Sequence, residues 1–237
     1  MRKAALAEVI TRYDFDVVGT QEGNDKQLAD LQRLLPGYAY LGHSYGGRDG
    51  KLHNCATYYK TDLFEAQDSG TFWFSETPDV YSLGWDADDP RIWHWVKLRE
   101  KKSGAEFFLF NSHFYWRYKT AKANSGAVLV QKVKEIAGDA PVICVGDFNS
   151  DLSTPQMQEV LTMLKDARSI SETPAVGPLN TAFPGGVFEG EAGTRLDYIF
   201  LSTQFRALDY TSINDTYKDN RYPSDHFPVT SKVVLSW

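Results

Sequence analysis

Cysteine is scarce in this 237-residue chain, and the two that are present, Cys55 and Cys144, both lie within apolar, strand-like runs. We therefore expect two small buried thiols, with a disulfide between them as the alternative. Cysteine usage leaves the compartment open, and no signal peptide is visible at the N-terminus. The expectation is a cytoplasmic protein as the sequence is written, and an exported one if a signal peptide lies upstream of Met1.

Several common functional signatures are also missing. No apolar run is long enough to cross a membrane, and no Cys/His pairs have the spacing of a structural zinc site. The chain contains neither a P-loop nor a Gly-x-Ser-x-Gly elbow. These absences exclude the most easily recognised kinds of membrane protein, zinc-binding module and enzyme with a nucleophilic serine.

Basic residues are in deficit, with 25 Lys and Arg against 31 Asp and Glu, which gives a net charge of −6. A non-specific nucleic-acid binder needs a basic face that displaces counterions, so the balance argues against that class. It leaves open a nuclease with a locally basic groove, or an enzyme whose own metal ion supplies positive charge.

The composition is that of an ordinary globular protein, and no linker, low-complexity segment or short repeat divides the chain. We expect one domain over residues 1–237. Apolar spacing predicts helices over 1–13, 24–35, 119–137 and 154–165. Apolar runs predict strands over 16–20, 38–42, 55–60, 71–75, 92–98, 107–110, 142–145, 196–201, 208–213 and 229–235. Helices and strands mix without strict alternation, which predicts a layered α/β fold with mixed sheets.

The strand over 142–145 is the most informative stretch, because it runs directly into Gly146-Asp147-Phe148-Asn149. Asp147 and Asn149 lie two residues apart, so in an extended chain both side chains leave the same face. A buried and unpaired carboxylate is costly. The pair is therefore expected to open into a cleft or to hold a cation.

Acidic and histidine side chains recur near the ends of other predicted strands. They are Glu22, His113, Asp197, Asp225 and His226. Each has a structural explanation when taken alone, but together they indicate a site. The three acids at 86–89 are different, because Pro90 and their spacing favour a solvated turn.

Oxygen ligands without a soft-ligand cluster favour a hard cation, most simply Mg²⁺, with Mn²⁺ as the alternative. An EF-hand is excluded, because Leu152 stands where the calcium loop needs Gly and Gln158 where it needs Glu. A histidine oriented by an acid is a natural base near neutral pH. These groups together favour metal-assisted attack of water on phosphorus.

The motifs that carry these residues resemble those of the endonuclease/exonuclease/phosphatase superfamily. In chain order they are Gln21-Glu22, Asn111-Ser112-His113, Gly146-Asp147-Phe148-Asn149, Arg195-Leu196-Asp197-Tyr198 and Ser224-Asp225-His226. The likeness covers the whole chain. The superfamily includes CCR4/nocturnin-like and exonuclease III-like enzymes. A run over 73–78, with Pro90-Arg91 downstream, resembles an uncharacterised bacterial branch. The resemblance implies a DNase I-like fold, a four-layer α/β sandwich of two mixed β-sheets packed face to face with helices outside.

The resemblance also implies roles for the acids and the amide. Glu22 would bind the metal, and Asp225 would lie at its edge. Asp147 would position or deprotonate the attacking water. Asn149 would hold the phosphate and the developing charge.

The implied roles of the histidines follow the same likeness. His226 would act on the phosphate or as a base, oriented by Asp197, and His113 would donate to a phosphate oxygen. Arg91 and Trp116 are expected to bind the substrate.

Two departures from the family pattern stand out. Relatives begin with a strand that ends in an Asn near the metal, whereas this chain begins at the first helix, so we expect a domain that lacks its first strand and is N-terminally truncated as written. Many relatives also carry a Glu that pairs with the equivalent of His113. Here His53 takes that position, which predicts two neighbouring histidines.

The leading hypothesis is a monomeric, Mg²⁺-dependent phosphoesterase that hydrolyses a phosphomonoester or phosphodiester, most simply in a phosphorylated small molecule. The alternative is an endo- or exonuclease acting on DNA or RNA. The second alternative is a non-catalytic binding protein on the same scaffold.

Overall fold

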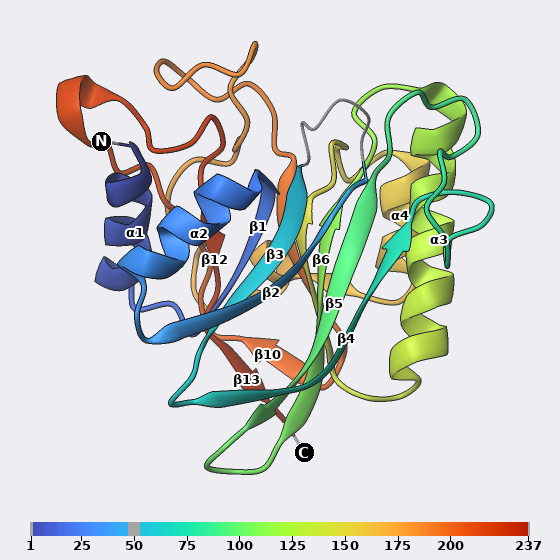
Figure 1. Cartoon of the computed structure of the whole chain (residues 1–237), viewed down its shortest axis with the longest axis horizontal. Coiled ribbons are helices and arrows are strands. Elements are labelled where there is room, and N and C mark those ends of the chain that lie inside the picture. The colour runs from blue at the N-terminus through green and yellow to red at the C-terminus, as the bar shows by residue number, and fades with distance from the viewer. Residues whose placement is uncertain (1, 47–52, 237) are drawn as a thin grey trace.

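The computed structural model describes residues 2–46 and 53–236 (Figure 1). The helices are α1 (Arg2–Arg12), α2 (Asp25–Leu34), α3 (Lys119–Ala137), α4 (Pro155–Leu161), α5 (Ala167–Ile170) and the short 3-10 helix η1 (Lys218–Asn220). The strands are β1 (Val17–Gly23), β2 (Tyr38–Ser44), β3 (Asn54–Lys60), β4 (Phe64–Trp73), β5 (Ile92–Glu100), β6 (Glu106–His113), β7 (Val142–Asp147), β8 (Lys165–Asp166), β9 (Asp197–Leu201), β10 (Phe205–Ala207), β11 (Thr211–Ser212), β12 (Val229–Thr230) and β13 (Val233–Leu235).

The larger sheet has the order β4-β5-β6-β7-β9-β8. Among its described strands the only parallel pair is β6–β7, so the sheet is mixed, as predicted. The smaller sheet has the antiparallel order β1-β3-β2. Two short pairs, β10–β13 and β11–β12, add further strands, and their apolar side chains join the core that lies between the sheets.

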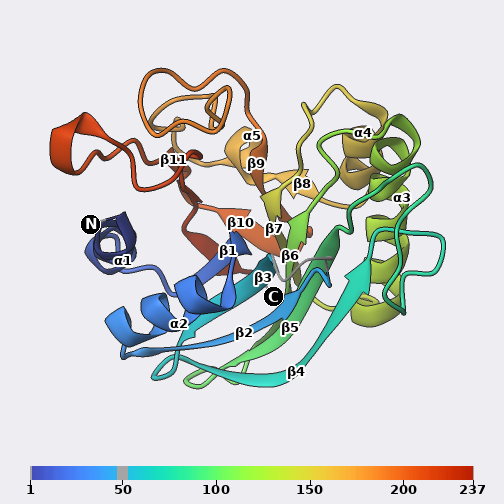
Figure 2. The same ribbon diagram turned by 45° about the horizontal axis from the view of Figure 1, so that its top comes forward.

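The layers follow from three apolar clusters. One lies between the two sheets and includes side chains from β5, β6, β7 and β9 with others from β1 to β3. A second packs α1 and α2 on the outer face of the smaller sheet, and the largest packs α3 and α4 on the outer face of the larger one. Figures 1 and 2 show the same arrangement of helices outside and sheets inside. The predicted four-layer sandwich is therefore confirmed.

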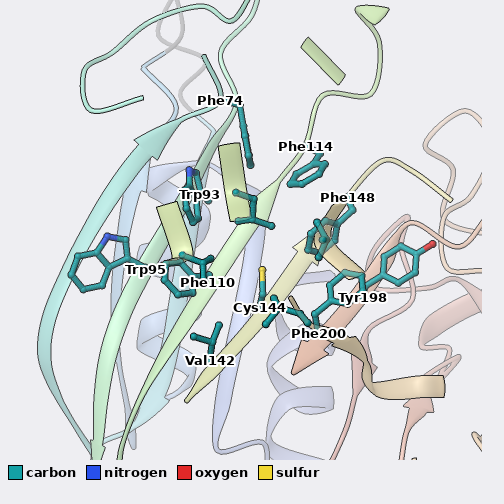
Figure 3. Packing of buried hydrophobic residues seen from close by; sticks show 14 of the residues in the cluster. Phe74, Trp93, Trp95, Phe110, Phe114, Val142, Cys144, Phe148, Tyr198 and Phe200 are labelled. Carbon is teal, nitrogen blue, oxygen red and sulfur yellow. The ribbon is translucent and has the colours of Figure 1, made fainter. Parts of the chain in front are cut away.

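The largest core is strongly aromatic (Figure 3). Phe148 lies at its centre, with ring centroids 4.8 Å from Phe114, 5.0 Å from Phe200 and 5.8 Å from Tyr198. Phe148 is fully buried in this core, so it anchors the chain after β7 between its two polar neighbours, Asp147 and Asn149. The aromatic core thus positions one end of the predicted site.

Some predicted boundaries are wrong. The strand predicted over 71–75 begins at residue 64, and the helix predicted to reach 165 ends at Leu161. The strands predicted over 208–213 and 229–235 shrink to the short β11, β12 and β13, because loops interrupt them. Both cysteines are free and buried, as expected. Among the described residues, no helix is both long and apolar enough to cross a membrane.

The acidic turn before β5 has a structural role that the sequence analysis missed. The carboxylate of Asp86 accepts hydrogen bonds from the backbone N–H groups of Thr120 (3.1 Å) and Ala121 (2.8 Å). Tyr118 at the N-cap of α3 makes no side-chain cap bond. Asp86 therefore caps α3 from a distant loop, where a negative charge is favourable.

Asn111 on β6 joins the two sheets through its fully buried amide. Its Nδ2 donates to the backbone carbonyls of Thr20 and Ala56, each at 3.0 Å, and its Oδ1 accepts from Gln21 Nε2 at 2.6 Å. Gly19 keeps the sheets close, since a Cβ there would lie 2.7 Å from Val145 Cγ2. This connection fixes β1 over β6 and β7.

We expect Asn111→Ala to lower the free energy of unfolding by about 2–4 kcal/mol, because it removes three hydrogen bonds from a fully buried position, those to the Thr20 and Ala56 carbonyls and to the Gln21 amide. Asn124→Ala on α3 is the matched control, since this half-buried amide donates to the Thr120 carbonyl within its own helix. Urea unfolding measures both. Equal effects of the two substitutions would contradict the linking role of Asn111.

Candidate active site

Strand register brings three of the predicted residues into one row. His113 lies opposite Asp147 across the parallel pair β6–β7, and Asp147 lies opposite Asp197 across β7–β9. Directly paired residues on adjacent strands have neighbouring side chains. The sequence places these residues far apart, and the sheet order alone makes them adjacent.

His226 joins this row from the loop between η1 and β12. Its Nδ1 lies 2.8 Å from Asp197 Oδ2, and its backbone N–H donates to Ser224 Oγ at 3.1 Å. Asp197 is fixed in turn by its backbone N–H, which donates to Thr181 Oγ1 at 3.1 Å. Asp197 therefore holds the His226 ring through its Nδ1 atom.

Asp147 and Asn149 hydrogen-bond to each other at the end of β7. Asp147 Oδ1 accepts from the Asn149 backbone N–H at 2.9 Å, and Asp147 Oδ2 lies 3.2 Å from Asn149 Nδ2. Asn149 Nδ2 also donates to the Phe114 carbonyl at 3.0 Å. Asn149 has a φ of 47°, a left-handed conformation that Asn tolerates better than most residues.

Glu22 reaches the row from the smaller sheet. The β1–β3 register shifts between Thr20 and Gly23, and Glu22 has a φ of 62° within this irregularity. Its Oε1 lies 3.7 Å from His113 Nε2, while Asp147 Oδ2 lies 3.5 Å from the same nitrogen. Two carboxylates from different sheets therefore lie near the same ring nitrogen of His113, Nε2.

The direct hydrogen-bond partner of His113 is Tyr45 and not His53. The Nδ1 of His113 lies 2.6 Å from the Tyr45 hydroxyl, while His53 acts on His113 electrostatically. His53 is exposed, and its ring centroid lies 6.0 Å from that of Tyr45. Sequence reasoning missed Tyr45 because it follows β2 in a stretch without a recognisable motif.

The charges at the two histidines differ. Burial, with Arg91 and His226 nearby, depresses the pKa of His113 well below its usual value, so the ring is neutral. Burial also opposes charge on His226, but the adjacent Asp197 and Asp147 outweigh it and raise the pKa of His226 to about 10. Burial and the neighbouring Asp197 raise the pKa of Asp147 to about 7. The row thus combines a neutral imidazole, an imidazolium and a carboxylate that titrates near neutrality.

Three potential ligand atoms, from Asp147, Asp197 and His226, lie within 4.8 Å of one another. His226 is an unsuitable metal ligand in this group, because its Nδ1 is bound to Asp197 and its raised pKa keeps the ring protonated. The pair of carboxylates from Glu22 and Asp147 suits a hard cation better, since Mg²⁺ is usually held by one or two carboxylates. The donor set therefore fits Mg²⁺ or Mn²⁺.

The remaining predicted residues lie around the row. Asp225 precedes His226 and is partly exposed, with its Oδ1 3.5 Å from Ser224 Oγ. Arg91 is buried, donates to Asp89 and to the Pro90 carbonyl, and lies 5.8 Å from the Tyr45 ring centroid. It acts electrostatically on His113 but does not hydrogen-bond to it.

Trp116 is different, because 56% of its surface is exposed. It lies two residues after Phe114, whose carbonyl accepts from Asn149, and the Arg117 guanidinium lies 5.1 Å from its ring. Trp116 therefore offers an exposed aromatic surface two residues along the chain from Phe114, whose backbone carbonyl contacts Asn149.

Comparison with known proteins agrees with this architecture. The model of the Endonuclease/Exonuclease/phosphatase family matches residues 1–226. A solved structure described as a mannosyl-6-phosphatase of Bacteroides thetaiotaomicron VPI-5482 is 35% identical, with a TM-score of 0.90, and the match covers 99% of this chain and 91% of that one.

Two curated relatives come from eukaryotes. The CCR4-Not complex 3'-5'-exoribonuclease subunit Ccr4 of Candida albicans is 22% identical, over 99% of this chain and 37% of its own length. Nocturnin of Drosophila melanogaster is 26% identical, over 99% of this chain and 42% of its own length. The chain therefore spans less than half the length of these two relatives. From the family match, the chain belongs to the endonuclease/exonuclease/phosphatase family, as its motifs predict.

Proposed function

We propose that this protein is a metal-dependent phosphoesterase that cleaves the phosphomonoester of a small molecule by attack of water on phosphorus. The observation that carries the proposal is the row itself. Asp147 lies between the Asp197–His226 pair on one side and the His113–Glu22 contact on the other. Members of the family are hydrolases that act on phosphoester bonds.

Glu22 and Asp147 would hold the divalent cation, with Asp225 at its edge. When bound, the cation supplies positive charge that stabilises the phosphoryl oxygens. Burial, and then the neighbouring Asp197, raise the pKa of Asp147, so a cation bound there would offset the cost of its charge.

Asp147 is the best candidate to orient and deprotonate the attacking water. Its carboxylate lies at the centre of the row, between His113 and Asn149 on one side and Asp197 on the other, where the attacking water would have to bind. His226 is already protonated near neutrality, which suits it to donate to the anionic phosphate rather than to accept a proton. Asp197 keeps it charged and oriented.

The phosphate would lie against His113 and Asn149. The Nε2 atom of His113 is farther than 3.2 Å from both neighbouring carboxylates, so neither contact is a strong hydrogen bond. Asn149 Nδ2 holds Asp147 at 3.2 Å, the longer of its two bonds, and this is the one it would exchange for a phosphate oxygen. Both groups can therefore donate to substrate without breaking a short internal bond.

A sugar phosphate is the substrate class that we favour. The matched mannosyl-6-phosphatase aligns over 99% of this chain at 35% identity. The exposed ring of Trp116 offers the kind of apolar face on which a sugar packs. Arg91, which lies near the Tyr45 ring, would contribute positive charge close to His113.

A nuclease is the second candidate, favoured by the match to the exoribonuclease subunit Ccr4 over 99% of this chain. The net charge of −6 gives no general attraction to a polyanion. A non-catalytic binding protein is supported less, because binding alone does not require a carboxylate that titrates near neutrality beside a held imidazolium.

We expect Mg²⁺-dependent hydrolysis of mannose 6-phosphate, and a loss of at least about 10²-fold in kcat/KM for His226→Ala and for Asp147→Asn. Asp62→Asn, an exposed carboxylate in the turn between β3 and β4, is the control and should leave the rate unchanged. Release of inorganic phosphate measures all four proteins.

Full activity in His226→Ala would refute the assigned mechanism. Faster cleavage of RNA or plasmid DNA than of any small phosphate, with strong salt sensitivity, would favour the nuclease instead.

We expect Trp116→Ala to raise KM for mannose 6-phosphate by about 2- to 10-fold with little change in kcat, because it removes a stacking surface and no reacting group. Glycerol phosphate, which has no ring to stack, should show no such change. Tyr13→Ala is the control, as Tyr13 is another exposed aromatic, located after α1. Equal effects on both substrates would argue against a sugar-binding role for Trp116.

A further inference from the structure

We propose that Tyr45 is a positioning residue that fixes His113 as a neutral imidazole carrying its proton on Nε2, the nitrogen that faces the substrate. The inference rests on the proposed function for its catalytic meaning, but the tautomer can be measured without any assay of activity. The argument follows from the hydrogen bonds around one hydroxyl group.

The Tyr45 hydroxyl has one proton to donate and two lone pairs that accept. The backbone N–H of Glu22 donates to it at 3.3 Å, and the Cys55 thiol donates to it at 3.5 Å. These two donors account for both lone pairs. The remaining contact, to His113 Nδ1 at 2.6 Å, must then use the hydroxyl's own proton. His113 Nδ1 is the acceptor, and the ring proton of the neutral imidazole is on Nε2.

This arrangement is enclosed. Tyr45, Cys55 and His113 are each at most 3% exposed, so solvent does not replace a lost partner. The backbone of Tyr45 is held from both sides, since its N–H donates to the His53 carbonyl at 2.8 Å and its carbonyl accepts from Trp73 Nε1 at 3.0 Å. The hydroxyl is therefore fixed in place by the fold and not by His113 alone.

The type of partner distinguishes the two histidines of the site. Asp197 is a carboxylate, and a carboxylate on one imidazole nitrogen favours the cation. Tyr45 is an uncharged phenol, which orients His113 without favouring a charge. The guanidinium of Arg91, 5.8 Å from the Tyr45 ring, would repel a second cation at this position. A phenol is thus the partner that suits a neutral donor.

The consequence lies on the other side of the ring. The Nε2–H of His113 points at a space bounded by Glu22 Oε1 at 3.7 Å and Asp147 Oδ2 at 3.5 Å. Neither atom is close enough for a strong hydrogen bond. A phosphate oxygen held beside these acids would meet a donor that is already oriented, which is the arrangement that stabilises developing negative charge.

The test combines nuclear magnetic resonance with kinetics on the full chain. Two-bond ¹H–¹⁵N spectra of protein labelled on its histidine rings report which nitrogen carries the proton, and His113→Asn identifies the His113 signals by their loss. We expect a protonated Nε2 and an unprotonated Nδ1 for His113 in the wild-type protein at pH 7, with and without Mg²⁺.

Tyr45→Phe keeps the ring contacts and removes only the hydroxyl. We expect His113 to lose its single tautomer and kcat to fall by about 10- to 10²-fold, the scale for a group that orients a functional histidine. Tyr59→Phe on β3 is the matched control and should change neither, because no hydrogen bond of its hydroxyl occurs among the described residues.

A proton on His113 Nδ1 in the wild-type protein would overturn the proposal whatever the activity. So would a Tyr45→Phe variant that keeps both the Nε2–H tautomer and the full kcat. If the wild-type protein shows the expected tautomer but hydrolyses no phosphoester, the proposed function fails while the assignment of the hydrogen bond stands.

Discussion

The buried amide of Asn111 is the connection on which the site depends. It bonds to two backbone carbonyls and one side chain of the smaller sheet while belonging to the larger one. Because Glu22 comes from one sheet and His113 and Asp147 from the other, their approach requires that the sheets keep one separation and one register. Leaving such groups unpaired in a core is costly, which makes this alignment specific.

The two histidines of the site differ in their hydrogen-bond partner and in their charge. One carries a carboxylate partner and is cationic, and the other carries a phenol partner and is neutral. Asp147 lies between them and is neither firmly charged nor firmly neutral near pH 7. Pairs of titratable groups whose environments drive their pKa values apart are typical of sites that move protons. In the function proposed above, these three groups would serve as a phosphate donor, an oriented neutral donor and a base.

Much of this could be predicted from strand ends. Glu22, His113, Asp147, Asp197 and His226 all follow or interrupt apolar runs, and the structure brings them together. Tyr45 could not be predicted, because its role depends on where β2 ends in space, and the pattern pointed to His53 instead. Asn111 was visible only as part of a motif, since its partners come from backbone carbonyls. Asp86 looked like a solvated turn because a cap supplied from a distant loop leaves no local pattern.

The most direct test of the account is metal binding at the junction of the two sheets. Calorimetric titration of Mn²⁺ should show one cation bound per chain, tightened by inorganic phosphate. Glu22→Gln and Asp147→Asn should each abolish or greatly weaken it, while Asp62→Asn should not. Absence of binding in the wild-type protein, or binding unchanged by both substitutions, would contradict a metal-dependent site built from these two carboxylates.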